Sequence, residues 1–227
     1  MGLVLHARVL AGAGNQGRFT MQEILSYIAL SMGVAWASGI NLYAAILVLG
    51  LLGSSGNMPL PDTLQILQNP LVIGTAGLMY CIEFFTDKIP GVDNLWDTLH
   101  TFIRIPAGAV LAASAVAEVD PSLTLSAALV GGGLTAATHL TKASTRLLVN
   151  TSPEPFSNIG VSLAEDTLVI GGLWAALHYP LVFLIFLVIF LLVMIWLLPI
   201  LWRGVKGMYD TLRGFFELDK PKRLPER

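Results

Sequence analysis

The feature that most constrains this chain is residues 182–198, VFLIFLVIFLLVMIWLL, which contain no charged side chain. A helix that crosses the hydrocarbon core of a bilayer needs about 20 mostly apolar residues. Other apolar segments precede this one, and 55% of the chain is hydrophobic while only 12% is charged. A soluble domain carries about 25% charged residues. The sequence therefore predicts an all-α polytopic membrane helix bundle with six transmembrane helices, over residues 24–53, 71–85, 102–119, 123–149, 159–177 and 181–202.

Small side chains are frequent in the first five apolar segments. Gly131, Gly132 and Gly133 lie in the fourth segment, and Ala109, Ala113 and Ala117 repeat every four residues in the third. Such residues let helix backbones approach closely within a membrane. We expect these helices to pack against one another, and the sixth to face lipid.

Basic residues predict how the segments thread the membrane, because cytoplasmic loops are enriched in Lys and Arg. With a cytoplasmic N-terminus and six crossings, all 13 Lys and Arg residues fall on cytoplasmic segments. We therefore expect both termini on the cytoplasmic side, N-in and C-in. The two cytoplasmic hairpins run in the same direction, which is compatible with a parallel hairpin repeat.

The chain divides into three predicted regions. Residues 1–20 do not join the apolar pattern, so they are expected to be a disordered tail or a mis-assigned start. Residues 21–202 form the transmembrane domain. Residues 203–227 are basic, with apolar side chains at roughly helical spacing. That composition predicts an amphipathic helix lying on the anionic inner leaflet.

Ionisable side chains lie in or beside the second to fifth apolar segments, where charge is costly and is usually paired or functional. Two interpretations stay open. In the first, the charges are neutralised clasps that close one end of the bundle: Glu83 pairs with Arg104, and Lys142 and Arg146 pair with Glu165 and Asp166. In the second, the charges line a polar cavity. The predicted substrate-binding residues are Asn41, Glu83, Asp87, Arg104, His139, Lys142, Arg146, Glu165 and Asp166.

Asn41 lies near the middle of the first segment, two residues after Gly39. This segment is too long for an untilted crossing. The pair marks either a break in the helix, as in transporters with discontinuous helices, or an interhelical hydrogen bond from Asn41, worth about 1 kcal/mol.

Asp93, Asp97 and His100 have spacings of four and three residues, so one helical face carries all three. Oxygen and imidazole ligands of this kind bind divalent cations. The three are therefore candidate metal ligands, although a solvated loop helix explains the two aspartates more simply. No P-loop, dinucleotide fingerprint or zinc pattern is present, so no cofactor is predicted.

Three stretches carry a family resemblance: SGINLY, EFFTDKIPGVDNLWDTLHTFIRIPAGA and TKASTRLLVNTSPEPFSNIGVSLAED. With them, the chain resembles the bacterial domain-of-unknown-function family numbered 4126. The resemblance covers about residues 21–177. It implies a small polytopic membrane protein and transfers no activity to any residue.

The leading functional hypothesis is a transporter or channel-like protein in the bacterial inner membrane, with a polar site built from the two charged hairpins and Asn41. The alternatives are a membrane enzyme that acts on lipid-linked phosphates through a divalent metal, and a membrane scaffold. The expected partners are membrane lipids and further copies of the chain in a homo-oligomer. No strongly basic face indicates nucleic-acid binding.

Overall fold

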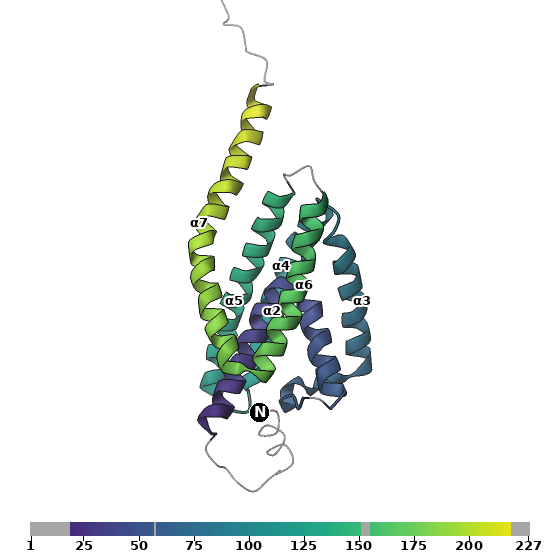
Figure 1. The fold of residues 1–227 in the computed structure, drawn as a ribbon, viewed down its shortest axis with the longest axis vertical. Coiled ribbons are helices and arrows are strands. Elements are labelled where there is room, and N and C mark those ends of the chain that lie inside the picture. The colour runs from purple at the N-terminus through teal and green to yellow at the C-terminus, as the bar shows by residue number, and fades with distance from the viewer. Residues whose placement is uncertain (1–18, 57, 151–154, 219–227) are drawn as a thin grey trace, which may run out of the picture.

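The computed structural model describes residues 19–56, 58–150 and 155–218, and all regular structure in this part of the chain is helical (Figure 1). The predicted all-α class is confirmed. In chain order the elements are α2 (Met21–Ser54), the short 3₁₀ helix η1 (Asp62–Gln68), α3 (Pro70–Thr86), α4 (Val92–Val116), α5 (Pro121–Val149), α6 (Pro155–His178) and α7 (Pro180–Leu218).

Prolines and polar caps mark the places where helices begin. Proline has no N–H to leave unpaired in a first helical turn, and α3, α5, α6 and α7 each start at one. Asn69 caps α3 by accepting a hydrogen bond of 2.9 Å from the N–H of Leu71. Asp120 caps α5 in the same way through the N–H groups of Ser122 and Leu123.

The first helix starts with a reciprocal cap formed by Thr20 and Glu23. The predicted tail, residues 1–20, includes one of these two residues, Thr20. Thr20 accepts from the N–H of Glu23, and the Glu23 carboxylate accepts from the N–H of Thr20. This capping box satisfies two backbone donors at the start of α2. Thr20 therefore belongs to the folded part, and residues 1–18 of the predicted tail lie outside the described residues.

The long helix α2 is two helices joined at Asn41, whose φ of −148° and ψ of 96° are not helical. Before the break, the Ser31 hydroxyl donates to the carbonyl of Ala112, near the end of α4. After the break, Gly50 packs on η1, and Thr63 of η1 donates to the carbonyl of Ser114, again near the end of α4. Both ends of α2 therefore lie at the same end of the bundle, and the chain reverses direction at Asn41 (Figure 1).

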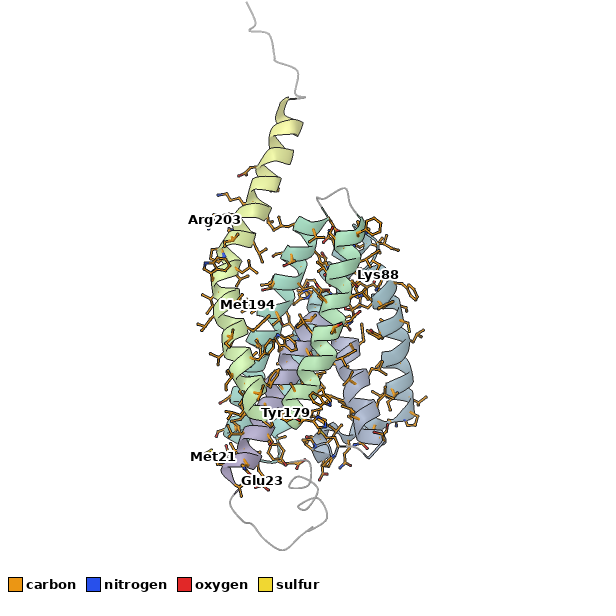
Figure 2. The ribbon with its side chains drawn as sticks, in the orientation of Figure 1. Met21, Glu23, Lys88, Tyr179, Met194 and Arg203 are labelled. Atoms are coloured by element: carbon orange, nitrogen blue, oxygen red, sulfur yellow. The ribbon has the colours of Figure 1, made fainter. Side chains whose placement is uncertain are left out.

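The remaining helices alternate between the two ends of the bundle. Met21 and Tyr179 lie at one end, whereas Lys88 and Arg203 lie toward the other (Figure 2). We call these the Met21 end and the Lys88 end. The described chain thus begins and finishes at opposite ends, because α2 returns to its starting end and α3–α7 each run from end to end. This arrangement does not match the predicted N-in/C-in threading, which needs six full crossings.

In the described part of the chain, five helices are long and apolar enough to cross a membrane: α2, α4, α5, α7 over Pro180–Gly207, and α6 over Phe156–His178. The apolar helix α3 is shorter, with 17 residues. These lengths indicate a multi-pass membrane protein. The number of crossings differs from a count of apolar segments because α2 folds back on itself.

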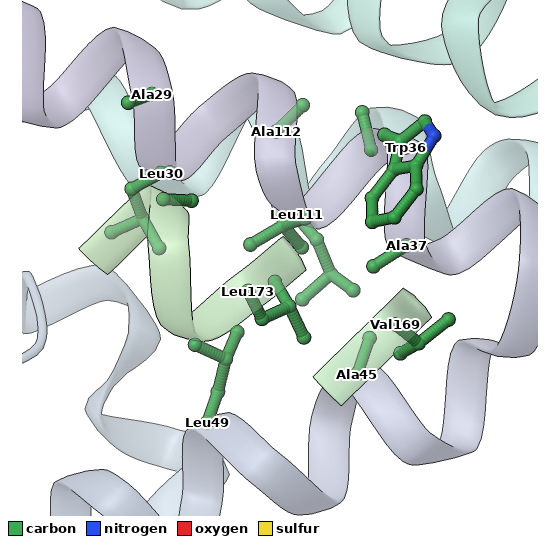
Figure 3. Packing of buried hydrophobic residues seen from close by; sticks show 14 of the residues in the cluster. Ala29, Leu30, Trp36, Ala37, Ala45, Leu49, Leu111, Ala112, Val169 and Leu173 are labelled. Atoms are coloured by element: carbon green, nitrogen blue, oxygen red, sulfur yellow. The ribbon is translucent and has the colours of Figure 1, made fainter. Parts of the chain in front are cut away.

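The buried core forms around α2, and Figure 3 shows its packing on α4 and α6 through Leu111, Ala112, Val169 and Leu173. Small residues set the close approaches. A Cβ atom added to Gly131 would overlap Ala112, and one added to Gly172 would overlap the Trp36 ring. These contacts confirm the predicted role of small residues in helix packing. The outer face of α7 is the opposite case, with exposed apolar side chains such as Ile185, Leu192 and Trp196.

The C-terminal part does not form a separate element. α7 continues without interruption through Trp202 to Leu218, with Pro199 inside it, and extends beyond the other helices (Figure 1). The predicted amphipathic helix over residues 203–227 stays a prediction, and residues 219–227 lie outside the described part.

Candidate functional site

Four helices bring charged side chains to one buried cluster in the half of the bundle toward the Lys88 end. Helical spacing explains how each helix contributes, because residues four or seven apart share a face. Glu83 on α3 is four residues before Asp87 in the following turn, Lys142 is four before Arg146 on α5, and Asp97 is seven before Arg104 on α4. We define the ionic cluster as Glu83, Asp87, Asp93, Asp97, Arg104, Lys142, Arg146 and Glu165.

Arg104 joins α3, α4 and α5 and is completely buried. Its guanidinium donates to Glu83 at 2.5 Å and to Asp97 at 2.9 Å. It also lies 3.2 Å from Nδ1 of His139, which must accept because arginine has only donors. His139 is therefore neutral, with its proton on Nε2, 2.7 Å from the Thr101 hydroxyl. His139 thus positions Arg104 without adding charge.

Lys142 connects the ionic cluster to the break in α2. Its ammonium lies 2.9 Å from Asp87 and 3.3 Å from Glu83. Its third hydrogen bond, of 3.0 Å, goes to the carbonyl of Ile40, the residue before Asn41. The last carbonyls of a helix have no partner within the helix. Lys142 therefore supplies a charged donor to a carbonyl that the break leaves free.

Arg146 holds α6 and the turn after α3 to α5. It donates from two nitrogens to the Glu165 carboxylate and at 2.7 Å to the backbone carbonyl of Asp87. It also donates at 2.7 Å to the side-chain oxygen of Asn158. Asn158 is not among the site residues that the sequence predicts. Its spacing of seven residues from Glu165 along α6 is the signal that places the two on one face.

The ionic cluster contains five carboxylates but only three basic side chains. Three carboxylates each keep one buried oxygen without a hydrogen-bond partner: Glu83 through Oε2, Asp87 through Oδ1 and Asp97 through Oδ2. Buried polar atoms in native proteins nearly always have partners. Arg104 Nε, a donor, is also without a partner, so the network is short of positive charge and its hydrogen bonds are incomplete on both sides.

Asn41 and Asp166 form a second polar contact beside the ionic cluster. The Asn41 side-chain NH₂ donates to Asp166 at 3.1 Å, and its oxygen accepts from the N–H of Ala44 at 2.9 Å. Asn41 thus caps the second half of α2 while it binds α6. Both sequence interpretations hold together, since Asn41 is at once a helix break and an interhelical hydrogen bond.

The three candidate metal ligands contact different partners. Asp93 accepts from the Asn150 side chain at 2.8 Å, Asp97 binds Arg104, and His100 donates from Nδ1 to the carbonyl of Trp96 at 2.8 Å while it stacks on the Trp96 ring. Among the described residues, no group of three His, Cys, Asp or Glu side chains could hold a metal ion. The alternative of a solvated loop helix is wrong, because Asp93 and Asp97 are fully buried.

Lys88 lies in the turn between α3 and α4, at the edge of the ionic cluster. Its ammonium donates to the carbonyl of Phe84 at 2.9 Å and lies 3.0 Å from the centre of the Phe84 ring. Partial burial lowers the pKa of Lys88, and the nearby Asp166 and Asp87 carboxylates oppose that shift. Among the described residues, Lys88 makes no ion pair with the ionic cluster, in contrast to Arg104, Lys142 and Arg146.

Comparison with known proteins places the chain in a family. Residues 28–200 match a family described as a domain of unknown function, DUF4126. The chain belongs to this family. The match confirms the resemblance seen in the sequence, and no curated protein or solved structure matches the chain at a significant level.

The DUF4126 region contains the whole ionic cluster, Asn41 and Asp166, and it ends within α7. The structure brings all nine predicted substrate-binding residues of this DUF4126 chain into one connected region. The clasp interpretation holds for Glu83 with Arg104 and for Arg146 with Glu165. It does not hold for Asp166, which pairs with Asn41 instead.

Proposed function

We propose that this protein is a membrane transport protein whose polar site is the ionic cluster together with the Asn41 break. The observation that carries the proposal is the excess of buried carboxylates beside a helix that enters the bundle and turns back. Ionisable groups inside membrane proteins are costly, and they mark ion and substrate pathways in many of them.

The charge balance favours a functional site over a purely structural clasp. Removing an ion from water costs several kcal/mol even in a real protein, and a well-placed partner must offset that cost. A structural clasp works best with matched partners, whereas the ionic cluster has five carboxylates for three basic groups. Protons taken up from solution would reduce this excess of negative charge.

The broken helix supplies a place for movement. Discontinuous helices form the substrate sites of many transporters, where the ends of half-helices face the bound ion or solute. Here Lys142 holds the end of residues 21–40 and Asn41 caps the start of residues 42–54. Both halves of α2 are thus tied to the charged region.

Membrane orientation follows from charge. The described Lys and Arg residues lie toward the Lys88 end or beyond it on α7, and the described loops at the Met21 end carry none. Because positive charge favours the cytoplasm, the Lys88 end is cytoplasmic and the start of α2 lies on the opposite side. We place the protein in a bacterial inner membrane, with lipid on the exposed face of α7, and assembly as a homo-oligomer stays a prediction.

Transport is tested with purified protein in liposomes that contain a pH-sensitive dye. Concentration jumps of monovalent cations, amino acids and small carboxylates are applied across the membrane, and currents and internal pH are recorded. We expect at least one solute to move in the wild type, and Glu83→Gln and Glu165→Gln to reduce its rate at least tenfold. Asp210→Asn, on the exposed part of α7, is the control. Folded variants that transport as fast as the wild type would refute the site.

A further inference from the structure

Asp166 differs from the other buried carboxylates of this region because no basic side chain of the described residues is paired with it. Its side chain lies on α6 and the residue is 8% exposed. Oδ1 accepts the hydrogen bond from Asn41, and the buried Oδ2 has no hydrogen-bond partner. Glu165, the preceding residue, shows the contrast, since Arg146 donates to both of its oxygens.

The basic groups nearest to Asp166 are already engaged. Arg104 is held by Glu83 and Asp97, Lys142 by Asp87 and Glu83, and Arg146 by Glu165. The charged and titratable groups that face Asp166 are Tyr80 on α3, Asp87 and Lys88 in the turn after it, and Lys142 on α5. Asp87 opposes a negative charge on Asp166, and Lys88 and Lys142 favour it without forming an ion pair.

We propose that Asp166 is a proton-binding site that acts on the break in α2. A buried carboxylate without a paired cation is strongly unfavourable, and such a group takes up a proton instead of staying ionised. The proton binds at the unpartnered Oδ2, so the carboxylate becomes a neutral carboxylic acid and no other covalent bond changes. A proton needs no cavity, which fits a side chain that is nearly buried.

The position of Asn41 connects this proton to the fold. The Asn41 NH₂ donates to Asp166, and hydrogen bonds to an ionised acceptor are stronger than those to a neutral one. Proton binding therefore weakens the bond between α6 and the break, and proton release strengthens it. The occupancy of one carboxyl group controls how firmly the turn of α2 is held to α6.

The test is infrared difference spectroscopy on the purified protein in lipid at neutral pH. The difference between wild type and Asp166→Asn should contain the C=O band of a protonated carboxylic acid, which shifts in D₂O. The exposed control Asp210→Asn should lose only ionised carboxylate bands. A wild-type minus Asp166→Asn spectrum that contains only carboxylate bands would overturn the proposal.

Two further measurements keep the test decisive. If Asp166→Asn does not fold, Asp166→Glu replaces it, because this variant keeps a carboxyl group. We expect the frequency of the carboxylic acid band to shift in Asp166→Glu while the band itself stays present. A band at the wild-type frequency would count against Asp166. Sodium and potassium ions are then added to the wild type at constant pH. Loss of the band on adding either ion would show that the site takes a metal cation, which would also overturn the proposal.

This inference deepens the proposed function and rests on it for its purpose, but it does not share its test. The spectra are recorded on resting protein with no solute gradient. A protonated Asp166 in a protein that moves no solute would refute transport and leave the proton site intact. Transport by a protein in which Asp166 is ionised would refute the proton site and leave the transport proposal intact.

Discussion

At the scale of single residues, Arg104 is the side chain on which the ionic cluster most depends. It binds Glu83 and Asp97 at shorter distances than Lys142 does, and all three side chains are buried. Removing one partner from a buried ion pair typically costs about 3–5 kcal/mol, because the other charge stays behind without compensation.

We therefore expect Arg104→Gln to lower the free energy of unfolding by about 3–5 kcal/mol. Denaturant unfolding in mild detergent measures the change, with the exposed Arg203→Gln as the control. The double variant Arg104→Gln with Glu83→Gln should lose less than the sum of the single losses, since the two groups interact directly. Strict additivity would mean that the pair contributes no coupling.

Asp120 offers a residue-scale prediction on pH. Hydrogen bonds from the Ser122 hydroxyl and from the N–H groups of Ser122 and Leu123 lower the pKa of this exposed cap. A carboxylate with a lowered folded pKa adds stability above its unfolded pKa of about 3.9, and that stability is lost as the pH falls through the folded value. Asparagine also caps helices well but carries no charge.

The melting temperature of Asp120→Asn should therefore lie below that of the wild type at neutral pH, and the gap should close as the pH falls below about 4. Thermal unfolding across a pH series gives the comparison. A gap that is constant over the whole series would show that the charge of Asp120 contributes nothing at the start of α5.

At the scale of elements, the reversal of α2 depends on one side chain. Asn41 caps Ala44 and binds Asp166, so Asn41→Ala removes both contacts at the turn. We expect hydrogen exchange to accelerate in residues 42–54 and to stay unchanged in α5, as measured by mass spectrometry of the peptides. Asn69→Ala, which removes the equivalent cap of α3, should accelerate only the start of α3. Unchanged exchange in residues 42–54 would show that packing alone holds the turn.

Close helix contacts give a second prediction at this scale. A Cβ atom on Gly39 would overlap the Thr138 side chain and lie 2.6 Å from the backbone oxygen of Thr135, whereas one on Gly133 meets nothing within 4 Å. Overpacking a buried contact costs about 1–3 kcal/mol. Gly39→Ala should therefore lower the free energy of unfolding by at least that amount, and Gly133→Ala should leave it unchanged or raise it, because alanine favours helix.

At the scale of the whole molecule, the threading of the chain is the most direct test of the fold. In a Cys81→Ala background, Gln22→Cys and Ser122→Cys should react with a membrane-impermeant thiol reagent from the same, non-cytoplasmic side. Lys206→Cys should react only from the cytoplasmic side, in inverted vesicles. Labelling of Gln22→Cys and Lys206→Cys from the same side would support the N-in/C-in arrangement and contradict the reversal at Asn41.

Much of this molecule is determined by its sequence alone. Hydropathy over residues 182–198 and the other apolar runs places the helices in a membrane, because each run must satisfy its own backbone hydrogen bonds there. Helix starts are also local, as Thr20, Asn69 and Asp120 show with their neighbouring residues. The members of the charged site could be recognised for the same reason, since charge inside an apolar run is visible without any structure.

Only the tertiary structure decides how these parts combine. Hydropathy cannot distinguish a helix of 34 residues that crosses from one that turns back, because the difference lies in the φ and ψ angles of Asn41. Likewise, Asp93 and Asp97 resemble a solvated loop until Asn150 and Lys142 arrive from positions distant in sequence. Burial and pairing depend on the neighbours that a side chain meets in space, and in this fold those neighbours come from other helices.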